Sequence, residues 1–339
     1  MAKIKVGVVG LGMMGFTHLD AYHDMEDVEV IALADANPKR LSGEERPGGN
    51  IEGQAQGGFD FSKVRKYTDA QALINDPDVQ VVDICVPTPG HLEWCKAAFA
   101  AKKHVLVEKP LARTAADARQ IAELAGAAGV LAMPAHCMRF WPGWTWLKAA
   151  VSSAKYGKVL SASFKRTASH PAGPFYKDGA ACGGAALDLH IHDTDFVMHL
   201  FGMPASVSSS GYSSITSEPD HLFTQYHFPG GPVVTAEGGW AMTQGYPFVM
   251  QYTVNFEKAT AVFDISAENP LRLYEAGKEP VAIDLPKGMG YAAEIAYFIQ
   301  CVKTGKQPET VTLAQGADAL RIIEAEVASV KAGGKSVAV

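Results

Sequence analysis

Cysteine is scarce in this sequence. Its 339 residues include five cysteines, which are scattered along the chain and form no CxxC pair. An odd number of isolated cysteines is typical neither of a disulfide framework nor of a zinc site built on thiolates. We therefore expect reduced thiols, a cytoplasmic location and no bound metal.

Three further features are missing: a long apolar run, an excess of basic residues and a secretory leader. No uninterrupted apolar segment is long enough to cross a bilayer, and the opening MAKIKVGVVGLG lacks the apolar run and cleavage site of a signal peptide. Lys and Arg number 30 against 36 Asp and Glu, a formal net charge of −6. Because nucleic acids are bound by clustered cations, neither a nucleic-acid partner nor a membrane is expected.

The first part of the chain alternates short apolar strands with helices. Such alternation predicts a parallel sheet covered by helices on both faces, with the ligand at the edge formed by the strands' carboxyl ends. We place a dinucleotide-binding domain of this kind over residues 1–130. Its predicted strands are 4–10, 28–35, 79–86, 104–107 and 130–135.

The pattern changes after about residue 150. Short strands now follow one another with turn-rich connections, which predicts a second domain of α+β class with a large, mostly antiparallel open sheet. We assign residues 131–339 to this substrate-binding and oligomerisation domain and leave open that the C-terminal helix packs back on the first domain. The predicted strands are 158–168, 205–213, 221–228, 232–241, 247–256, 259–265 and 271–275, with helices at 291–304 and 313–331. An uncovered apolar face of such a sheet would favour a homodimer or homotetramer.

A glycine motif follows the first predicted strand. Gly10, Gly12 and Gly15 fit GxGxxG, and Met13 and Met14 open the helix that comes next. Glycines there let the backbone approach a pyrophosphate, whose charge is met by the N–H groups of the helix start. The strand–turn–helix context therefore predicts a dinucleotide site.

An acidic residue follows the second predicted strand. Asp35 lies about 20 residues beyond the glycines, where a carboxylate would bind the adenosine ribose hydroxyls. A carboxylate there repels a 2′-phosphate, which favours NAD. Lys39 and Arg40, close by, leave NADP open as an alternative. The Gly-rich segment 43–58 has no apolar periodicity and is expected to be a mobile loop.

The segment 183–196, GGAALDLHIHDTDF, concentrates carboxylates and imidazoles in an apolar neighbourhood. On a helix, Asp188 and His192 share one face, with Asp195 three residues further on, while His190 points elsewhere. Three interpretations remain open for such a cluster: a catalytic pair, a metal site, or a polar helix face on which His190 and Asp193 pair.

Several motifs occur in an order and spacing that resemble the glucose-fructose oxidoreductase / inositol dehydrogenase (Gfo/Idh/MocA) family over nearly the whole chain. They are GxGxxG with its following aspartate, Pro87-Thr88-Pro89-Gly90-His91, Glu108-Lys109-Pro110, His136-Cys137-Met138-Arg139-Phe140 and the GG…DxxxH segment. The resemblance implies a Rossmann domain followed by an open antiparallel sheet domain.

The resemblance also implies roles for single residues. Lys109 would contact the nicotinamide ribose and the substrate hydroxyl, with a cis bond to the following proline. Asp188 and His192 would line the substrate cavity. His192 would then accept the hydroxyl proton. Asp188 would hold the imidazole or a neighbouring hydroxyl, and Lys109 would stabilise the alkoxide. The alternative assignment is that Lys109, rather than His192, is the base.

Further residues are carried over as binding contacts. Those expected at the cofactor, besides the glycines, Met13, Met14, Asp35, Arg40 and Lys109, are Pro87, Thr88, His91 and Glu108. Those expected at the substrate are His136, Arg166, Phe175 and Tyr176. Arg139 fits a structural ion pair better than a substrate contact.

These observations predict an NAD(P)-dependent oxidoreductase that transfers hydride between nicotinamide and a secondary alcohol or ketone of a sugar, cyclitol or sugar derivative. Two alternatives stay open. One is an NAD-dependent glycosidase that acts by transient oxidation, and the other is a non-catalytic NAD-binding sensor.

Overall fold

The computed structural model of the protein describes residues 3–48 and 57–339. The predicted mobile loop 43–58 therefore lies partly outside the described residues. The chain divides into two compact units, of which the first comprises Met1–Cys137 and Gly290–Ala317 and the second Met138–Met289 and Asp318–Val339. This division differs from the predicted ranges 1–130 and 131–339, because residues 132–135 add a strand to the first sheet and residues 290–304 form a helix against the first helix of that unit.

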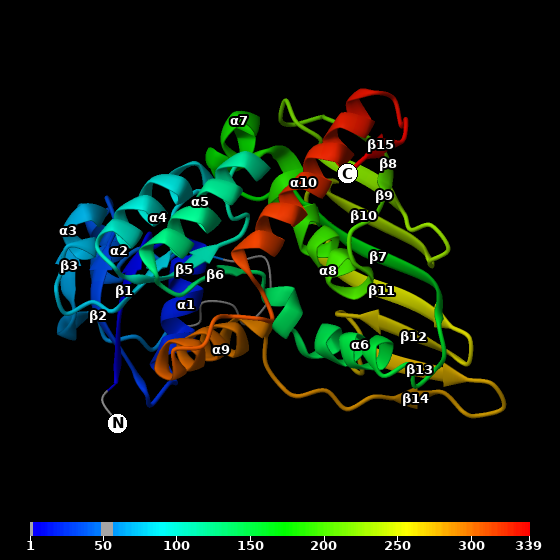
Figure 1. Ribbon diagram of the computed structural model, residues 1–339, viewed down its shortest axis with the longest axis horizontal. Helices are drawn as coiled ribbons and strands as arrows, with labels where there is room; N and C mark the ends of the chain where they lie inside the picture. The colour runs from blue at the N-terminus through cyan, green and yellow to red at the C-terminus, as the bar shows by residue number, and fades with distance from the viewer. Residues whose placement is uncertain (1–2, 49–56) are drawn as a thin grey trace. The chain divides into compact units, whose positions relative to one another are not determined.

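A parallel six-stranded sheet forms the centre of the first unit, with strand order β3-β2-β1-β4-β5-β6. Helices α1 and α9 cover one face, and α4 and α5 cover the other (Figure 1). The strands are β1 (Ile4–Val9), β2 (Val28–Ala34), β3 (Arg65–Tyr67), β4 (Val81–Ile84), β5 (His104–Glu108) and β6 (Ala132–Ala135). The helices are α1 (Met13–His23), α2 (Pro38–Ser42), α3 (Ala70–Ile74), α4 (His91–Ala100), α5 (Ala115–Ala128) and α9 (Gly290–Thr304), with short 3₁₀ turns η1 (Phe61–Lys63) and η2 (Thr88–Gly90).

Burial on both faces explains the composition of these strands. All four residues of β4 are buried, as are four of the five in β5. Central parallel strands have no solvated face, so they consist of apolar residues with little alternation. Asp83 in the middle of β4 breaks this rule, and its carboxylate is fully buried. A buried charge of this kind requires partners.

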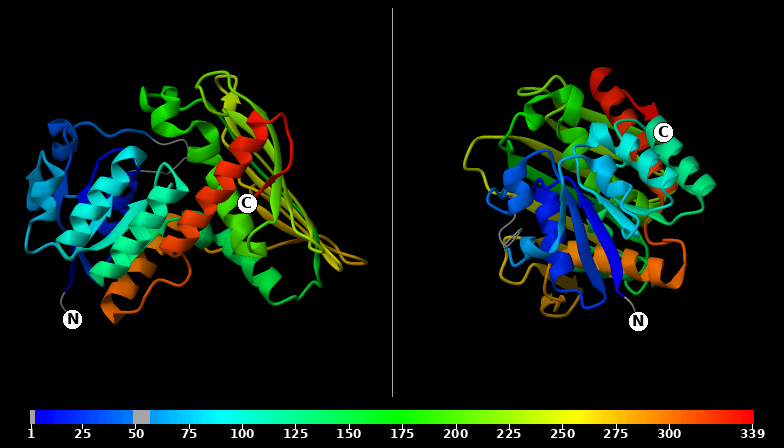
Figure 2. Two further views of the ribbon diagram at one scale, coloured as in Figure 1. Left: turned by 45° about the horizontal axis from the view of Figure 1, so that its top comes forward. Right: turned by 90° about the vertical axis from the view of Figure 1, so that its left-hand side faces the viewer.

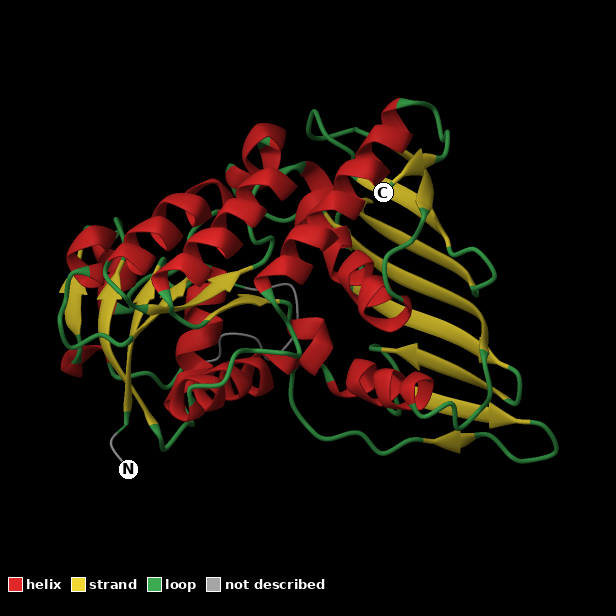
Figure 3. Ribbon diagram, viewed as in Figure 1, coloured by secondary structure: helices red, strands yellow, loops and turns green. Residues whose placement is uncertain are grey.

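A nine-stranded sheet forms the second unit, in the order β14-β13-β12-β11-β7-β10-β9-β8-β15. Its pairs are antiparallel except for β7 with β10, as predicted, and most of its strands are joined by turns (Figure 3). The strands are β7 (Val159–Ser169), β8 (Ser206–Tyr212), β9 (His221–His227), β10 (Val233–Met242), β11 (Val249–Phe256), β12 (Ala259–Asp264), β13 (Leu271–Glu275), β14 (Val281–Ala282) and β15 (Val337–Ala338). The helices are α6 (Pro142–Ser152), α7 (Gly179–Cys182), α8 (Ile191–Phe201) and, from Asp318 onward, α10 (Leu313–Lys331), whose first five residues belong to the first unit. The short elements are η3 (Cys137–Phe140), η4 (Phe175–Lys177) and the π-helix η5 (Ala186–His190).

One face of this sheet carries the core of the second unit. Helices α8 and α10 lie on that face (Figure 2). Trp144 of α6 is completely buried there and meets the rings of Phe196, Tyr252 and Phe263 edge-on at 4.6–6.3 Å between centroids. Such contacts add to the burial of apolar area. Trp144 is therefore a core residue, and helix α6 was not predicted from the sequence.

The opposite face of the sheet is mixed rather than apolar. Phe223 and Val233 are more than half exposed on it, and Tyr212 is half exposed. Between them, one cross-strand row reads Ser208, Gln225, Thr235, Ser163 and Thr253. The expectation of an apolar outer face is thus wrong, because polar side chains share this face with the apolar ones. Among the described residues, no helix has the length and apolarity needed to span a membrane.

Candidate active site

The glycine turn between β1 and α1 is built for close backbone approach. Gly10 has φ +90°, and a Cβ there would come within 2.8 Å of the Cys85 carbonyl. A Cβ at Gly15 would lie 2.1 Å from the Gly10 oxygen, so α1 can pack on the turn only with glycine at that position. Gly12 caps α1 without a side chain, and the space where its Cβ would stand is open. The turn therefore leaves room for an anionic ligand at the helix start, where Met13 and Met14 stand.

Asp35 follows β2 at the same edge of the sheet. Its Oδ2 accepts the Leu11 N–H at 2.7 Å, and its Oδ1 accepts the Asn37 N–H at 2.7 Å. These bonds hold the carboxylate in place and leave each oxygen a second lone pair for a ribose hydroxyl. Arg40, the expected cofactor contact nearby, instead donates its Nε–H to Glu45 at 3.2 Å.

His91 has a structural role that differs from the predicted one. Its ring is buried, with Nδ1 2.9 Å from the Pro110 oxygen and Nε2 2.9 Å from the Val86 oxygen. Burial lowers the pKa of this imidazole. The ring joins the loop that contains Pro87 to the loop after β5, so both nitrogens face the protein. The ring nitrogens of His91 thus have structural partners, and the expected contact of His91 with the cofactor stays a prediction. Thr88, in the same loop, is buried as well.

The end of β5 carries the Glu-Lys-Pro motif. The Lys109–Pro110 peptide bond is cis, in agreement with the resemblance. Glu108 is only 5% exposed; one of its oxygens accepts the Lys109 backbone N–H at 3.0 Å and the other lies 3.0 Å from His18 Nε2. The Glu108 carboxylate therefore faces the interior, and the expected contact of Glu108 with the cofactor stays a prediction. Lys109 itself is partly exposed.

A buried polar cluster in the first unit escaped the sequence analysis. His18 Nδ1 lies 2.8 Å from Asp83 Oδ2, and the Tyr22 hydroxyl donates to the same oxygen at 3.0 Å. Burial alone would lower the pKa of His18, but the Asp83 charge and hydrogen bond raise it well above its ordinary value. Two features of the sequence could have indicated this cluster. One is an aspartate inside an apolar strand, and the other is the spacing of His18 and Tyr22, four residues apart on one helix.

The same cluster is the one grouping among the described residues with ligand atoms close enough for a metal: His18, Asp83 and Cys85. The imidazole and carboxylate already bind each other, and burial raises the pKa of the Cys85 thiol, which disfavours the thiolate that a metal needs. Asp188 and His192 do not belong to such a grouping.

In the second unit, the quoted polar segment forms η5 and the start of α8. Asp188 and His192 are partly exposed, whereas His190 is completely buried. This separation agrees with the predicted faces, although residues 186–190 form a π-helix rather than an α-helix. Gly184 leads into η5 with φ +67°, and a Cβ there would meet the Pro219 oxygen at 2.7 Å. A π-bulge inside a helix is frequent at functional sites.

The other ionisable residues of this segment are internal. Asp193 is fully buried and binds Arg166 through two bonds, Nε to Oδ2 at 2.8 Å and Nη2 to Oδ1 at 2.9 Å. The interpretation of His190 and Asp193 as a surface pair is therefore wrong. Arg166 is 2% exposed: the alternation of β7 points it inward, and its guanidinium binds Asp193. Its expected contact with the substrate stays a prediction.

A second bidentate pair accounts for Asp195. Arg139 donates Nε–H and Nη2–H to the Asp195 carboxylate at 2.9 and 2.6 Å, and both side chains are buried. The preference for Arg139 as an ion-pair residue is confirmed. Asp195 does not share the exposed face of Asp188 and His192, because its carboxylate faces Arg139.

The remaining predicted substrate contacts differ in exposure. His136, after β6, is 1% exposed. Phe175 and Tyr176 are partly buried, and Tyr176 packs edge-on against Trp240 with ring centroids 5.8 Å apart. Both aromatic rings therefore belong in part to a small apolar cluster.

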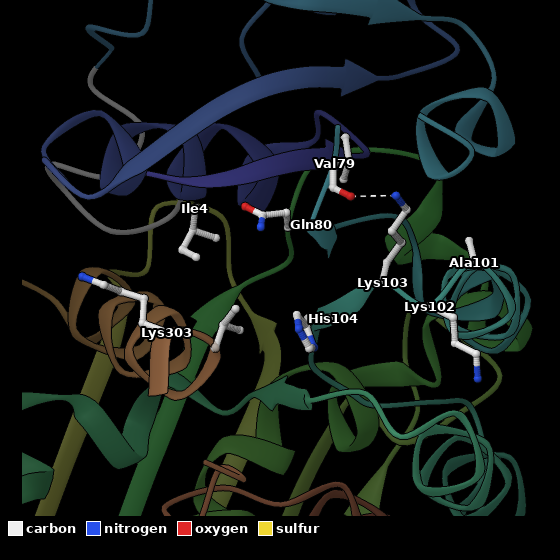
Figure 4. Close-up of a pocket in the computed structure, with 9 residues that line it drawn as sticks. Ile4, Val79, Gln80, Ala101, Lys102, Lys103, His104 and Lys303 are labelled. Carbon is white, nitrogen blue, oxygen red and sulfur yellow. Dashed lines mark hydrogen bonds between the residues drawn. The ribbon is translucent and has the colours of Figure 1, made fainter. Parts of the chain in front are cut away.

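A cavity of about 390 Å³ lies at the opposite, amino-terminal edge of the first sheet (Figure 4). Its lysines are engaged: Lys103 donates to the Val79 oxygen at 2.7 Å, and Lys303 binds Asp27 at 2.7 Å. This position, away from Gly10 and Lys109, makes it a poor candidate for the reaction. Its lining consists of Ile4, Val79, Gln80, Ala101, Lys102, Lys103, His104, Val302 and Lys303.

Two family models match the chain in sequence. Residues 4–136 match the oxidoreductase family with an NAD-binding Rossmann fold, GFO_IDH_MocA, and residues 144–262 match the GFO/IDH/MocA C-terminal domain. Together the matches cover the first sheet and most strands of the second.

Curated relatives include several dehydrogenases. The chain is 32% identical over 201 residues to myo-inositol 2-dehydrogenase of Thermotoga maritima, an alignment over 59% of this chain and 55% of that protein. It is 26% identical to D-apiose dehydrogenase of Paraburkholderia graminis over 98% of this chain and 88% of that protein. For the Thermotoga protein and for YhhX of Escherichia coli, at 55% and 49%, the chain spans about half of the relative's length.

Solved structures support the same fold. A levoglucosan dehydrogenase in complex with NADH and levoglucosan superposes with a TM-score of 0.84 at 22% identity, over 99% of both chains. A UDP-N-acetylglucosamine 3-dehydrogenase from Acidithiobacillus ferrooxidans gives 0.79 at 22% identity, over 99% of this chain and 100% of that one. At this level of identity the likeness concerns the fold.

Proposed function

Because this chain belongs to the GFO/IDH/MocA oxidoreductase family, we propose that it is an NAD-dependent dehydrogenase acting on a secondary alcohol or ketone of a sugar, cyclitol or sugar derivative. One observation carries the proposal: the glycine turn, Asp35 and the Lys109–Pro110 bond all stand at the carboxyl edge of one parallel sheet. Ligands of such sheets bind at this edge.

The first unit fits the dinucleotide. Gly10, Gly12 and the start of α1 would receive the pyrophosphate, and Asp35 the adenosine ribose. Arg40 is bound to Glu45 rather than held for a 2′-phosphate, which supports NAD over NADP. When bound, the nicotinamide supplies the redox chemistry, and the protein aligns the substrate and manages its protons.

We assign proton transfer and alkoxide stabilisation to residues whose side chains are partly exposed. His192 would accept the hydroxyl proton, with Asp188 orienting the imidazole or a neighbouring hydroxyl. Lys109 would stabilise the alkoxide as it develops. Asp188 and His192 differ from His190, Asp193 and Asp195 in remaining accessible, and this difference in exposure supports the assignment.

We also infer a cytoplasmic homo-oligomer. None of the five cysteines, all of which lie in the described part of the chain, is in a disulfide, which fits a reducing compartment. The outer face of the nine-stranded sheet exposes Phe223 and Val233 among small polar side chains. A flat face of this composition suits a second copy of the chain, which would cover the aromatic and aliphatic residues.

The test is a spectrophotometric panel of cyclitols, aldoses, sugar acids and nucleotide sugars with NAD and NADP separately. We expect reduction of NAD by at least one polyol or sugar and a lower kcat/KM with NADP. NAD retained through purification without net NADH would indicate the glycosidase instead. Binding of NAD with no turnover of any compound, glycosides included, would indicate a sensor.

A further inference from the structure

The buried cluster around His18 connects three elements of the first unit. His18 belongs to α1, the helix whose start follows the glycine turn. Its Nδ1 contacts Asp83 in the middle of β4, and its Nε2 lies 3.0 Å from Glu108 at the end of β5. The exposed fraction of the His18 side chain is zero, as is that of Asp83. No surface exchange with water competes with these contacts.

Two carboxylates on opposite sides favour an imidazolium in the centre. The Asp83 charge and hydrogen bond keep the His18 proton despite burial, and the cation then attracts the Glu108 oxygen. Cys85 and Tyr22 are the other ionisable groups beside Asp83; the thiol lies 3.5 Å from His18 Nδ1, and burial raises the pKa of both. Both are therefore neutral, which leaves the His18 imidazole as the basic group between the Asp83 and Glu108 side chains.

The second oxygen of Glu108 extends this chain of contacts to the motif that follows. It accepts the Lys109 backbone N–H at 3.0 Å, immediately before the cis bond to Pro110. The position of the Glu108 carboxylate therefore determines where the backbone of Lys109 leaves the strand. The Glu108 carboxylate therefore contacts the His18 imidazole on one side and accepts a hydrogen bond from the Lys109 amide on the other.

We propose that His18 is a positioning residue: it joins Asp83 to Glu108 from helix α1 and thereby sets the place of Lys109 relative to the glycine turn. The expected effect on turnover rests on the proposed dehydrogenase function. The contact of His18 with Asp83 and Glu108 does not depend on that function. A misplacement of a reacting group by about 1 Å can cost about 100-fold in rate.

The side chain's two nitrogens allow a matched pair of variants. The amide nitrogen of Asn reaches about as far as Nδ1, so His18→Asn can keep the Asp83 bond but loses the Glu108 contact. The amide of Gln reaches about as far as Nε2, so His18→Gln can keep the Glu108 contact. If His18 only filled space in the core, both substitutions would disturb the structure. The control is His23→Asn, at the exposed end of the same helix.

The first measurement is the Lys109 amide resonance in ¹⁵N-lysine-labelled protein, assigned through its absence in Lys109→Arg. We expect it to shift in His18→Asn and to stay near its wild-type position in His18→Gln and His23→Asn. An unshifted resonance in folded His18→Asn overturns the proposal. If His18→Asn does not fold, Asp83→Asn decides in the same way, because it removes the charge that holds the His18 proton and leaves Glu108, the acceptor of the Lys109 N–H, unchanged.

The second measurement is turnover with the substrate found in the panel. We expect kcat of His18→Asn to fall about 10- to 100-fold, with the NAD dissociation constant within about 3-fold of wild type and partial recovery in His18→Gln. Equal losses in the Asn and Gln variants contradict a positioning role. If the wild-type protein turns over nothing, the proposed function fails, and the amide resonance still decides whether His18 positions Lys109.

Discussion

At the scale of single residues, burial decides the charge state of several groups in the second unit. Glu326 and His190 are fully buried with 3.4 Å between carboxylate oxygen and Nε2. Burial raises the pKa of Glu326 to about 8 and lowers that of His190 to about 3. Both are therefore neutral at pH 7, and the contact joins neutral polar groups rather than an ion pair. Thr194 hydrogen-bonds Glu326 at 3.0 Å.

The raised pKa predicts how stability depends on pH. The folded protein keeps the Glu326 proton up to about pH 8, whereas the unfolded chain releases it near 4.5. Glu326 therefore stabilises the fold fully below pH 4.5, and this contribution is lost as the pH rises towards 8, by up to about 1.4 kcal/mol per pH unit. Glu326→Gln should remove that slope in urea unfolding between pH 6.5 and 8. The exposed Glu324→Gln should leave it unchanged, and an unchanged slope in Glu326→Gln would contradict the prediction.

A second prediction at this scale concerns the base. His192→Asn should lower kcat by about 100- to 10,000-fold, because it removes the proton acceptor while leaving the first unit intact. The NAD dissociation constant, measured by fluorescence titration, should stay within about 3-fold. Near-normal turnover in His192→Asn together with a large loss in Lys109→Ala would assign the base to Lys109.

At the scale of elements, glycines decide where η5 can pack. Gly238 lies in β10, and a Cβ there would come within 2.2 Å of His190 Nδ1. Strand β10 packs against η5. The π-helix that carries Asp188 can therefore lie on the sheet only where β10 has no side chain. The sequence showed glycine pairs at 183–184 and 238–239, but not that one glycine faces a histidine.

This packing gives a prediction with an internal control. Gly238→Ala should lower the free energy of unfolding by about 1–3 kcal/mol, because the His190 ring must move to admit the methyl group. Gly126→Ala, in helix α5 with open space around the position, should be neutral or raise stability by up to about 1 kcal/mol. Both are measured by urea unfolding monitored by circular dichroism. Equal stability of wild type and Gly238→Ala would show that the ring is not held there.

At the scale of the whole molecule, we expect copies of the chain to associate through the outer face of the nine-stranded sheet. Phe223 is 53% exposed and Val233 58%, each surrounded by cross-strand polar neighbours. Glu237 lies on the same face, where it pairs with Lys165 at 3.0 Å and with His221 at 3.2 Å. Such a mixture resembles the surface of a subunit interface more than a folding core.

Phe223→Lys should shift the protein from oligomer to monomer at micromolar concentration, because a charged side chain would be placed opposite a second copy of the same face. Sedimentation velocity measures the change. Ile215→Lys, an exposed apolar residue in the loop between β8 and β9, should leave the oligomer intact. A wild-type protein that sediments as a monomer would refute the assembly itself.

The sequence by itself determined the alternation of strands and helices, the glycine turn with Asp35 and the accessible face of Asp188 and His192. These features depend on residues close in the chain, since periodicity and backbone freedom are local properties. Only the tertiary structure decided which charges meet: Arg166 with Asp193, Arg139 with Asp195, and His18 with Asp83, which are 27, 56 and 65 residues apart. Burial forces every such charge to find a partner, but the topology of the sheets decides which partner is near.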